Sequence, residues 1–319
     1  MSLPPDFHSL HPESQAFLKY LSEESASRQE EITPELAREA ALATTLESDG
    51  RLDFEYQGER REYIVPSPHD SAGIPVWVYI PSTVAPHPAI FVYFHGGGFT
   101  VGNRVTHDTC CKMVATESKC VMVNVDYRLA PEHKLPAPMD DGIAAVRWAM
   151  DNKALIGGSP SSKVGIGGDS AGGRIASSVA HDVTGLAFQI LVYTCVDATY
   201  PFPSSQLFAE GYGLTMASML WYAKQFTKDE SDRSDPRLST IKRPRFGHLP
   251  PTLFVVASHD PIRDDSAAYA SKLSEAGVKN ETLYLEGVVH TFFRLPGFFK
   301  ENCQKAYKKV AQFIQENAQ

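Results

Sequence analysis

The chain has 319 residues, of which 43% are hydrophobic and 21% charged, a composition typical of a globular protein and not of a disordered or collagen-like chain. Its 30 Lys and Arg residues are outnumbered by 38 Asp and Glu residues, and the formal net charge of −8 argues against a general binder of nucleic acids or anionic membranes. A chain near 300 residues buries roughly 75% of its unfolded surface, so a large core requires no disulfide or metal.

The first fifty residues are expected to form helices without strands. Pro34 suits the first position of a helix, and Thr33 before it is predicted to be the N-cap. Leu36, Leu42 and Leu46 are expected to supply the apolar contacts of this helix. We interpret residues 1–50 as cap helices added to a core at 51–319.

Short apolar segments then alternate with helical patterns along most of the chain. Several are continuously apolar, which is typical of parallel strands covered on both faces. The pattern predicts an α/β fold in which a mostly parallel sheet is flanked by helices. A second interruption at about 199–245, with one helix near Met216–Phe226, is interpreted as an insertion belonging to the cap. The predicted strands are 74–80, 90–94, 121–125, 164–166, 188–193, 253–257 and 282–285.

The segment 163–173 is predicted to be a strand, a glycine-rich turn and the start of a helix. Gly168, Ser170 and Gly172 have the Gly-x-Ser-x-Gly spacing of a nucleophile elbow, in which small neighbours allow a sharp turn that presents the serine hydroxyl. A phosphate-binding loop would require Gly-Lys-Ser/Thr, and a dinucleotide-binding turn would require glycine in place of Ser170. A structural turn is the remaining alternative.

Three glycines after His95 directly follow the predicted strand 90–94. Their uncovered backbone N–H groups could hold a developing oxyanion together with the N–H group of Ala171. Any two of Gly96, Gly97 and Gly98 could donate. A flexible turn without this role is the other interpretation.

A serine nucleophile requires a base, and the base requires an acid that orients it. Asp260 follows the strand predicted at 253–257, and His290 follows the one at 282–285, in the order expected after an elbow. Asp264 is the second candidate for the acid, but it is expected to be the N-cap of the next helix. The predicted catalytic residues are Ser170, Asp260 and His290.

Five motifs in this order resemble the hormone-sensitive-lipase-like esterases, a group that includes bacterial carboxylesterases and the arylacetamide deacetylases. The resemblance extends from about residue 60 to the C-terminus. It implies the α/β-hydrolase fold, with an eight-stranded sheet under a helical cap, and a carboxylic ester hydrolase. The motifs are His95–Gly98, Asp126–Glu132, Gly168–Gly173, Asp260–Asp264 and Gly287-x-x-His290-x-Phe292.

The resemblance also implies a role for each motif. Ser170 is the implied nucleophile, Asp260 the acid and His290 the base, with Gly97, Gly98 and Ala171 as oxyanion donors. Asp126 and Arg128 are the implied structural pair that braces the His95 loop. Three departures bear on substrate preference: Arg174 stands where the family usually has Asn, the segment 180–188 is short, and Thr194 stands where the family usually has Pro.

Other residues point to few additional roles. No histidine spacing is typical of a metal site, and neither a metal nor an organic cofactor is expected. The five cysteines contain no Cys-x-x-Cys pair. We expect them to be buried, apolar side chains of a protein in a reducing compartment, and a redox role for Cys110 and Cys111 is the alternative. Without a secretory start or a spanning apolar run, a cytoplasmic location is predicted. The expected partner is a small-molecule ester, with no nucleic acid and no membrane insertion, and a homodimer is a possible assembly.

The cap insertion is rich in aromatic and aliphatic residues, which predicts an apolar pocket of limited volume. Short- to medium-chain acyl esters, about C2 to C8, are therefore the predicted substrates, cleaved through an acyl-enzyme intermediate. An arylacetamide-deacetylase-like amidase is one alternative, because ester and amide hydrolysis share a tetrahedral state. A non-catalytic receptor similar to the plant gibberellin receptors is another, but His290 occupies the position that is changed there.

Overall fold

The computed structural model describes residues 3–26 and 32–318. In this part of the chain, eight strands form one sheet in the order β1-β2-β4-β3-β5-β6-β7-β8. The pairs β1/β2 and β2/β4 are antiparallel and the other five are parallel, so the expected mostly parallel sheet is confirmed. The strands are β1 (Gly58–Val65), β2 (Ile74–Pro81), β3 (Ile90–Phe94), β4 (Val121–Val125), β5 (Val164–Asp169), β6 (Gln189–Val192), β7 (Thr252–His259) and β8 (Asn280–Val289).

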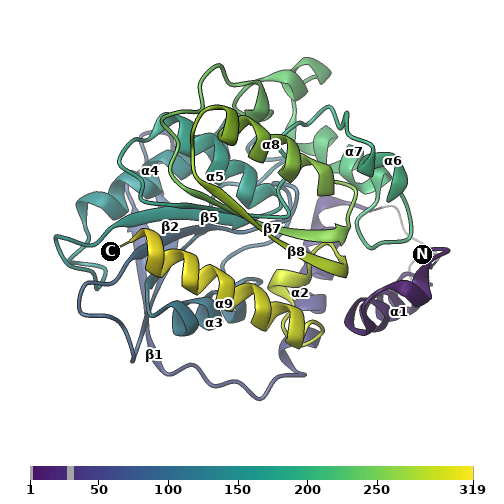
Figure 1. The fold of residues 1–319 in the computed structure, drawn as a ribbon, viewed down its shortest axis with the longest axis horizontal. Helices are drawn as coiled ribbons and strands as arrows, with labels where there is room; N and C mark the ends of the chain where they lie inside the picture. The colour runs from purple at the N-terminus through teal and green to yellow at the C-terminus, as the bar shows by residue number, and fades with distance from the viewer. Residues whose placement is uncertain (1–2, 27–31, 319) are drawn as a thin grey trace.

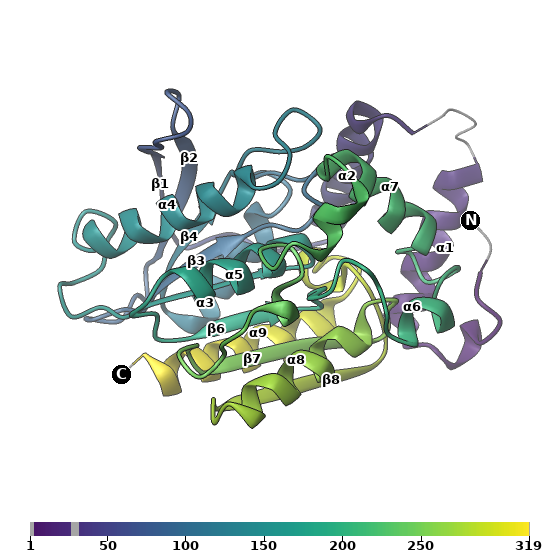
Figure 2. The same ribbon diagram turned by 90° about the horizontal axis from the view of Figure 1, so that it is seen from above.

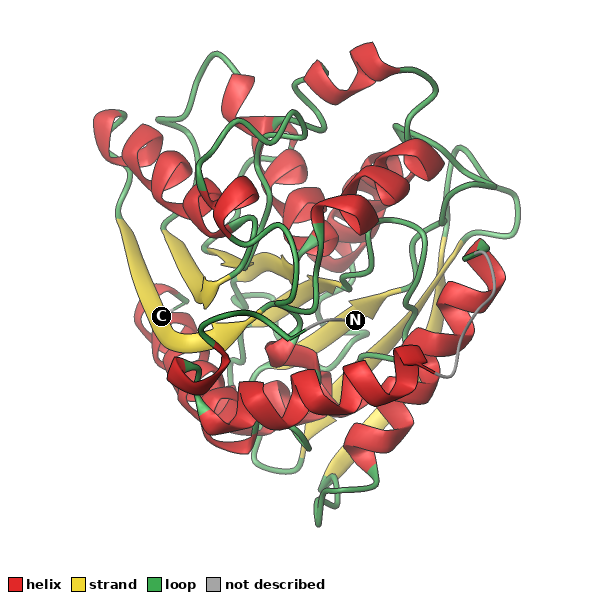
Figure 3. Ribbon diagram, turned by 90° about the vertical axis from the view of Figure 1, so that its right-hand side faces the viewer, coloured by secondary structure: helices red, strands yellow, loops and turns green. Residues whose placement is uncertain are grey.

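Helices cover both faces of the sheet (Figure 1, Figure 3). On one face lie α3 (Asp108–Ser118) and α9 (Lys300–Asn317), and on the other lie α4 (Ala137–Asp151), α5 (Ala171–Asp182) and α8 (Arg263–Glu275). The central strands are buried on both sides, because residues 90–94 and 121–125 are all inaccessible to solvent. Their continuously apolar sequences are therefore explained by two separate cores, one under each helix layer.

Further helices gather at one end of the sheet (Figure 2). They come from the N-terminal region, as α1 (Pro12–Ala26) and α2 (Pro34–Asp49), and from the segment between β6 and β7, as α6 (Ser204–Leu207) and α7 (Met216–Phe226). Short 3₁₀ helices complete the structure: η1 (Phe7–Ser9), η2 (Glu230–Ser234), η3 (Thr240–Lys242) and η4 (Phe292–Arg294).

Helix α2 begins as predicted but packs differently. Thr33 is the N-cap, since its hydroxyl oxygen accepts a hydrogen bond from the Leu36 N–H group, and Pro34 is the first helical residue. The prediction that Leu36 and Leu46 provide apolar contacts is wrong, because these side chains are 36% and 60% exposed. The buried positions of α2 are the polar Thr45 and Ser48.

Strand β1 was not among the predicted strands. It pairs with β2 over eight residue pairs at the edge of the sheet and is largely exposed.

All five cysteines are buried and free, as the apolar interpretation expects. Within 3–26 and 32–318, no helix has the length and hydrophobicity that crossing a membrane requires.

We predict that His181, in α5, makes folding stability sensitive to acid. Its Nε2 atom lies 3.0 Å from the Tyr269 hydroxyl group. Burial, followed by the charges of Arg243 and His248, lowers the pKa of His181 to about 3. The unfolded chain binds a proton here near pH 6.5, so stability that is present above that pH is lost as the pH falls toward about 3.

The variant His181→Gln cannot take up this proton. We therefore expect its free energy of unfolding to fall less than that of the wild type between about pH 7.5 and pH 5, as measured by urea denaturation. An equal fall in both proteins would contradict the prediction.

Candidate active site

Ser170 stands at the sharp turn between β5 and α5. Its backbone has φ 53° and ψ −117°, a conformation that side-chain-bearing residues rarely adopt and that is found at functional turns. A Cβ atom at Gly168 or Gly172 would collide with the carbonyl oxygen of Phe94. The Gly-x-Ser-x-Gly spacing thus lets the turn lie directly against the end of β3.

Ser170 is connected to Asp260 through His290. The Ser170 Oγ atom lies 3.0 Å from His290 Nε2, and Asp260 Oδ2 lies 2.6 Å from His290 Nδ1. Asp260 is fully buried and His290 is 5% exposed. The Nδ1–H group can donate to the carboxylate while Nε2 accepts the proton of the serine hydroxyl, which is the arrangement of a nucleophile with its base and orienting acid.

Asp264, the second candidate for the acid, lies elsewhere. It is in the first turn of α8, where its carboxylate accepts the Ser204 N–H group at 2.9 Å and the Arg263 Nε–H group at 2.8 Å. The expectation that it caps this helix is also wrong, because Ile262 occupies the N-cap position. Asp264 instead fixes the start of α6 to α8.

The glycine loop after β3 lines the same cavity as Ser170. Gly97 (φ 124°) and Gly98 (φ 57°) have positive φ angles, which glycine adopts without strain. In the described part of the chain, the N–H groups of Gly97, Gly98 and Ala171 have no hydrogen-bond acceptor, and all three residues line one cavity with Ser170. The Gly96 N–H group donates to Asp169 Oδ1 at 2.8 Å, so it is already occupied.

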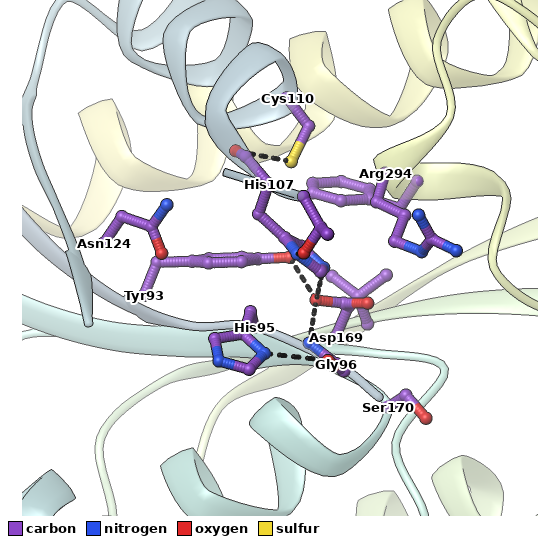
Figure 4. Close-up of polar contacts among 12 residues, drawn as sticks. Tyr93, His95, Gly96, His107, Cys110, Asn124, Asp169, Ser170 and Arg294 are labelled. Carbon is purple, nitrogen blue, oxygen red and sulfur yellow. Dashed lines mark hydrogen bonds and ion pairs between the residues drawn. The ribbon is translucent and has the colours of Figure 1, made fainter. Parts of the chain in front are cut away.

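Asp169, the residue before the serine, lies between the glycine loop and His107 (Figure 4). Besides Gly96, its Oδ1 atom accepts the Tyr93 hydroxyl group at 2.8 Å and lies 3.2 Å from His107 Nε2. Burial alone would raise the pKa of Asp169, but His107 and the Tyr93 hydroxyl group outweigh it and hold this pKa below its usual range. A buried negative charge thus lies directly against the loop.

Tyr127, not an Asp126–Arg128 pair, supports His95. The Tyr127 hydroxyl group donates to the His95 carbonyl oxygen at 2.6 Å, and the two rings stack with centroids 4.2 Å apart. Asp126 lies 3.1 Å from Arg104, and Arg128 lies 2.7 Å from Asp141 in α4. These two residues form no ion pair with each other; Asp126 instead holds the segment that follows the glycine loop, since it also accepts the Arg104 N–H group at 3.3 Å, whereas Arg128 is fixed to α4.

His95 is neutral in this environment. Burial, followed by the neighbouring His107, lowers its pKa to about 3, and its Nδ1 atom lies 2.8 Å from the Gly96 carbonyl oxygen. The histidine that begins the glycine motif is therefore a packed support of the loop, with no access to a ligand.

A cavity of about 1390 Å³ opens above Ser170. Its roof comes from α1, α2 and α7, and a Cβ atom at Gly98 would collide with the ring of Tyr222 in α7. Arg38 in α2 connects the roof to the loops beneath it, since its side chain donates to the carbonyl oxygens of Thr100 and Ala130, both at 2.9 Å. Two arginines, Arg174 and Arg294, line the same cavity.

Comparison with known proteins assigns the family. Residues 91–294 match a family model described as alpha/beta hydrolase fold. Carboxylesterase NlhH of Mycobacterium tuberculosis is 40% identical over 231 residues, which cover 69% of this chain and 71% of NlhH. The chain belongs to the hormone-sensitive-lipase-like carboxylesterases. The predicted family and enzyme class, a carboxylic ester hydrolase, are thereby confirmed.

Two further matches agree. The carboxylic ester hydrolase LipN of Mycobacterium tuberculosis is 35% identical over 238 residues, which are 72% of this chain and 63% of LipN, so less than two thirds of that relative is matched. The solved structure of the ester-hydrolase EH1AB1 from the metagenome of Lake Arreo has a TM-score of 0.88 and 34% identity, and covers 96% of this chain and 98% of that chain.

We predict that Asp169 sets the position of the glycine loop. Asp169→Asn removes the charge that faces Gly96 and His107, so kcat for ester hydrolysis should fall by about 10- to 100-fold with a smaller change in KM. The matched control is Tyr93→Phe, which removes a hydrogen bond to the same oxygen and leaves the Gly96 contact. Steady-state kinetics of both variants test the prediction. Equal losses of kcat in Asp169→Asn and Tyr93→Phe would contradict the prediction.

Proposed function

We propose that this protein is a serine carboxylesterase that cleaves small-molecule esters through an acyl-enzyme intermediate. The observation that carries the proposal is the connected chain from Ser170 through His290 to Asp260, which lies on the floor of a cavity beside three unoccupied N–H groups. Family membership supports ester hydrolysis as the reaction.

In the first step, His290 Nε2 takes the proton of Ser170 as the hydroxyl oxygen attacks the ester carbonyl carbon. Asp260 keeps the imidazole in the required tautomer and stabilises the imidazolium that forms. The tetrahedral intermediate then collapses, and the alcohol leaves with the proton from His290. Water repeats the sequence on the acyl-enzyme, which releases the acid and restores Ser170.

The developing oxyanion is stabilised by the N–H groups of Gly97, Gly98 and Ala171. They are already in place before the reaction, so little reorganisation is needed, and each such donor typically contributes about 3 kcal/mol. Gly96 is not assigned to this group because its N–H group donates to Asp169.

The N-terminal helices, within residues 1–50, and the insertion at about 199–245 form the proposed cap that selects substrates. The cavity wall combines apolar side chains such as Phe99, Leu238 and Ile262 with the guanidinium groups of Arg174 and Arg294. A long alkyl chain would have to desolvate these cations without pairing them, which costs free energy. We therefore propose short- to medium-chain acyl esters as substrates.

The role of Ser170 can be tested by covalent labelling. A fluorophosphonate probe should label Ser170 stoichiometrically and abolish esterase activity. Ser170→Ala should prevent labelling and lower kcat by roughly 10⁴- to 10⁶-fold while the circular dichroism spectrum stays that of the wild type. Labelling at another residue, or full turnover by the variant, would exclude the assignment.

The substrate range can be tested with p-nitrophenyl esters from acetate to palmitate. We expect kcat/KM to reach its maximum between about C2 and C8, since each buried methylene contributes up to about 0.8 kcal/mol only until the available space is filled. The p-nitroanilide of the best acyl group should react far more slowly than the ester. A maximum at palmitate would refute the proposed range.

A further inference from the structure

Arg174 is a buried cation in the wall of the cavity. It lies in α5, four residues after Ser170, a distance of about 6 Å along the helix axis. The residue is 6% exposed, and its Nε–H group donates to the Cys195 carbonyl oxygen at 3.0 Å. The centre of the guanidinium group is 5.8 Å from the centroid of the Phe99 ring.

No carboxylate pairs with this guanidinium group. Among residues 3–26 and 32–318, no Asp or Glu oxygen lies within 4.0 Å of an Arg174 nitrogen, and the neighbouring Tyr200 hydroxyl group is neutral. Against the effect of burial, the charge of the buried acid Asp265 helps to raise the pKa of Arg174. None of the Asp265 oxygen atoms lies within 4.0 Å of the guanidinium group, however, and Oδ1 accepts the N–H groups of Val196 at 2.7 Å and Asp197 at 3.1 Å. Arg174 therefore has no direct ion pair within the described residues, and its guanidinium group remains available to an anionic partner in the cavity.

The remaining charges of the cavity do not supply that partner. Arg294 is a second cation, whose Nη1–H group donates to Thr45 Oγ1 at 2.8 Å. Glu24 and Glu39 lie at the mouth and are exposed, so water screens them. Asp169 also lines the cavity, but its Oδ1 atom already has the Gly96 N–H group, the Tyr93 hydroxyl group and His107 as partners, which leaves the two arginines as the charges available to an anionic ligand.

We propose that Arg174 binds a carboxylate group of the substrate, so that the preferred esters carry a free carboxylate a few carbon atoms from the scissile bond. The proposal rests on the proposed ester hydrolysis and names its substrate class. A planar guanidinium group can donate two parallel hydrogen bonds to a carboxylate, and such pairs are strong where water is excluded. The short distance between Ser170 and Arg174 along α5 limits the spacer to a few methylene groups.

The experiment compares esters that differ only in charge. Monomethyl glutarate and methyl pentanoate place a carboxylate or a methyl group at the end of the acyl chain. In the second pair, the anion 4-acetoxybutanoate and butyl acetate, the carboxylate or the methyl group stands at the end of the alcohol instead. Hydrolysis is followed in a pH-stat. If the carboxylate raises kcat/KM more in the first pair, the acyl side of the ester faces Arg174, and if it does so more in the second pair, the alcohol side faces it.

In the wild type, kcat/KM for the anionic ester should exceed that of its neutral counterpart by at least about 5-fold in one pair, a difference of about 1 kcal/mol. Arg174→Gln should abolish this ratio. A smaller ratio in both pairs, or a ratio that survives in Arg174→Gln, overturns the proposal.

Arg233→Gln is the matched control. Arg233 donates to the Ala198 carbonyl oxygen at 2.8 Å and lies 5.1 Å from the Tyr200 ring, but it is outside the cavity lining. It supports the same loop, so a purely structural effect would appear in both variants, whereas loss of anion recognition should appear only in Arg174→Gln.

Two further measurements separate the possible failures. If Arg174→Gln does not fold, competitive inhibition of the wild type by pentanoate is compared with inhibition by pentanamide. Stronger inhibition by pentanoate supports the proposal, and equal or weaker inhibition by pentanoate overturns it. If neutral esters are hydrolysed and Ser170 is labelled without any anionic preference, only this proposal fails. If no ester reacts and Ser170 is not labelled, the proposed function fails.

Discussion

The active site is organised around the buried carboxylate of Asp169. One of its oxygen atoms receives both the Gly96 N–H group and the Tyr93 hydroxyl group, and His107 lies beside it. The residue is joined directly to Ser170, so a single charge fixes the glycine loop relative to this serine. Because Asp169 is only 2% exposed, these interactions act at low dielectric, where they are strong when satisfied and costly when broken.

The sheet could be predicted from the sequence where burial leaves a clear pattern. Segment 90–94 is apolar, and segment 121–125 is apolar except for Asn124, because helices cover both of their faces. Strand β1 escaped prediction because it is an edge strand with the sequence Gly-Glu-Arg-Arg-Glu-Tyr-Ile-Val, and most of these residues face solvent. Its position depends on backbone pairing with β2, which hydrophobic periodicity does not report.

The site was predictable to the extent that it depends on local turns and chain order. The glycines around Ser170 are required by the close approach of β3, so their spacing is visible in the sequence. By contrast, the partners of Asp169 come from positions 93, 96 and 107, and no spacing indicates which of these side chains meet. For the same reason, the sequence does not indicate that Asp126 pairs with Arg104 or that Arg128 pairs with Asp141. Arg174 stood out as a departure from the family pattern, but only its surroundings show that it is an unpaired cation.

The roof of the cavity and its floor come from different stretches of the chain. Helices α1, α2 and α7 supply the roof, while every residue of the Ser170–His290–Asp260 chain belongs to the loops that end the sheet's strands. Contacts such as those of Arg38 with Thr100 and Ala130 connect the two parts at the rim. Substitutions in α1, α2 and α7 can therefore reshape the roof of the cavity while the strand-end loops that carry Ser170, His290 and Asp260 stay unchanged.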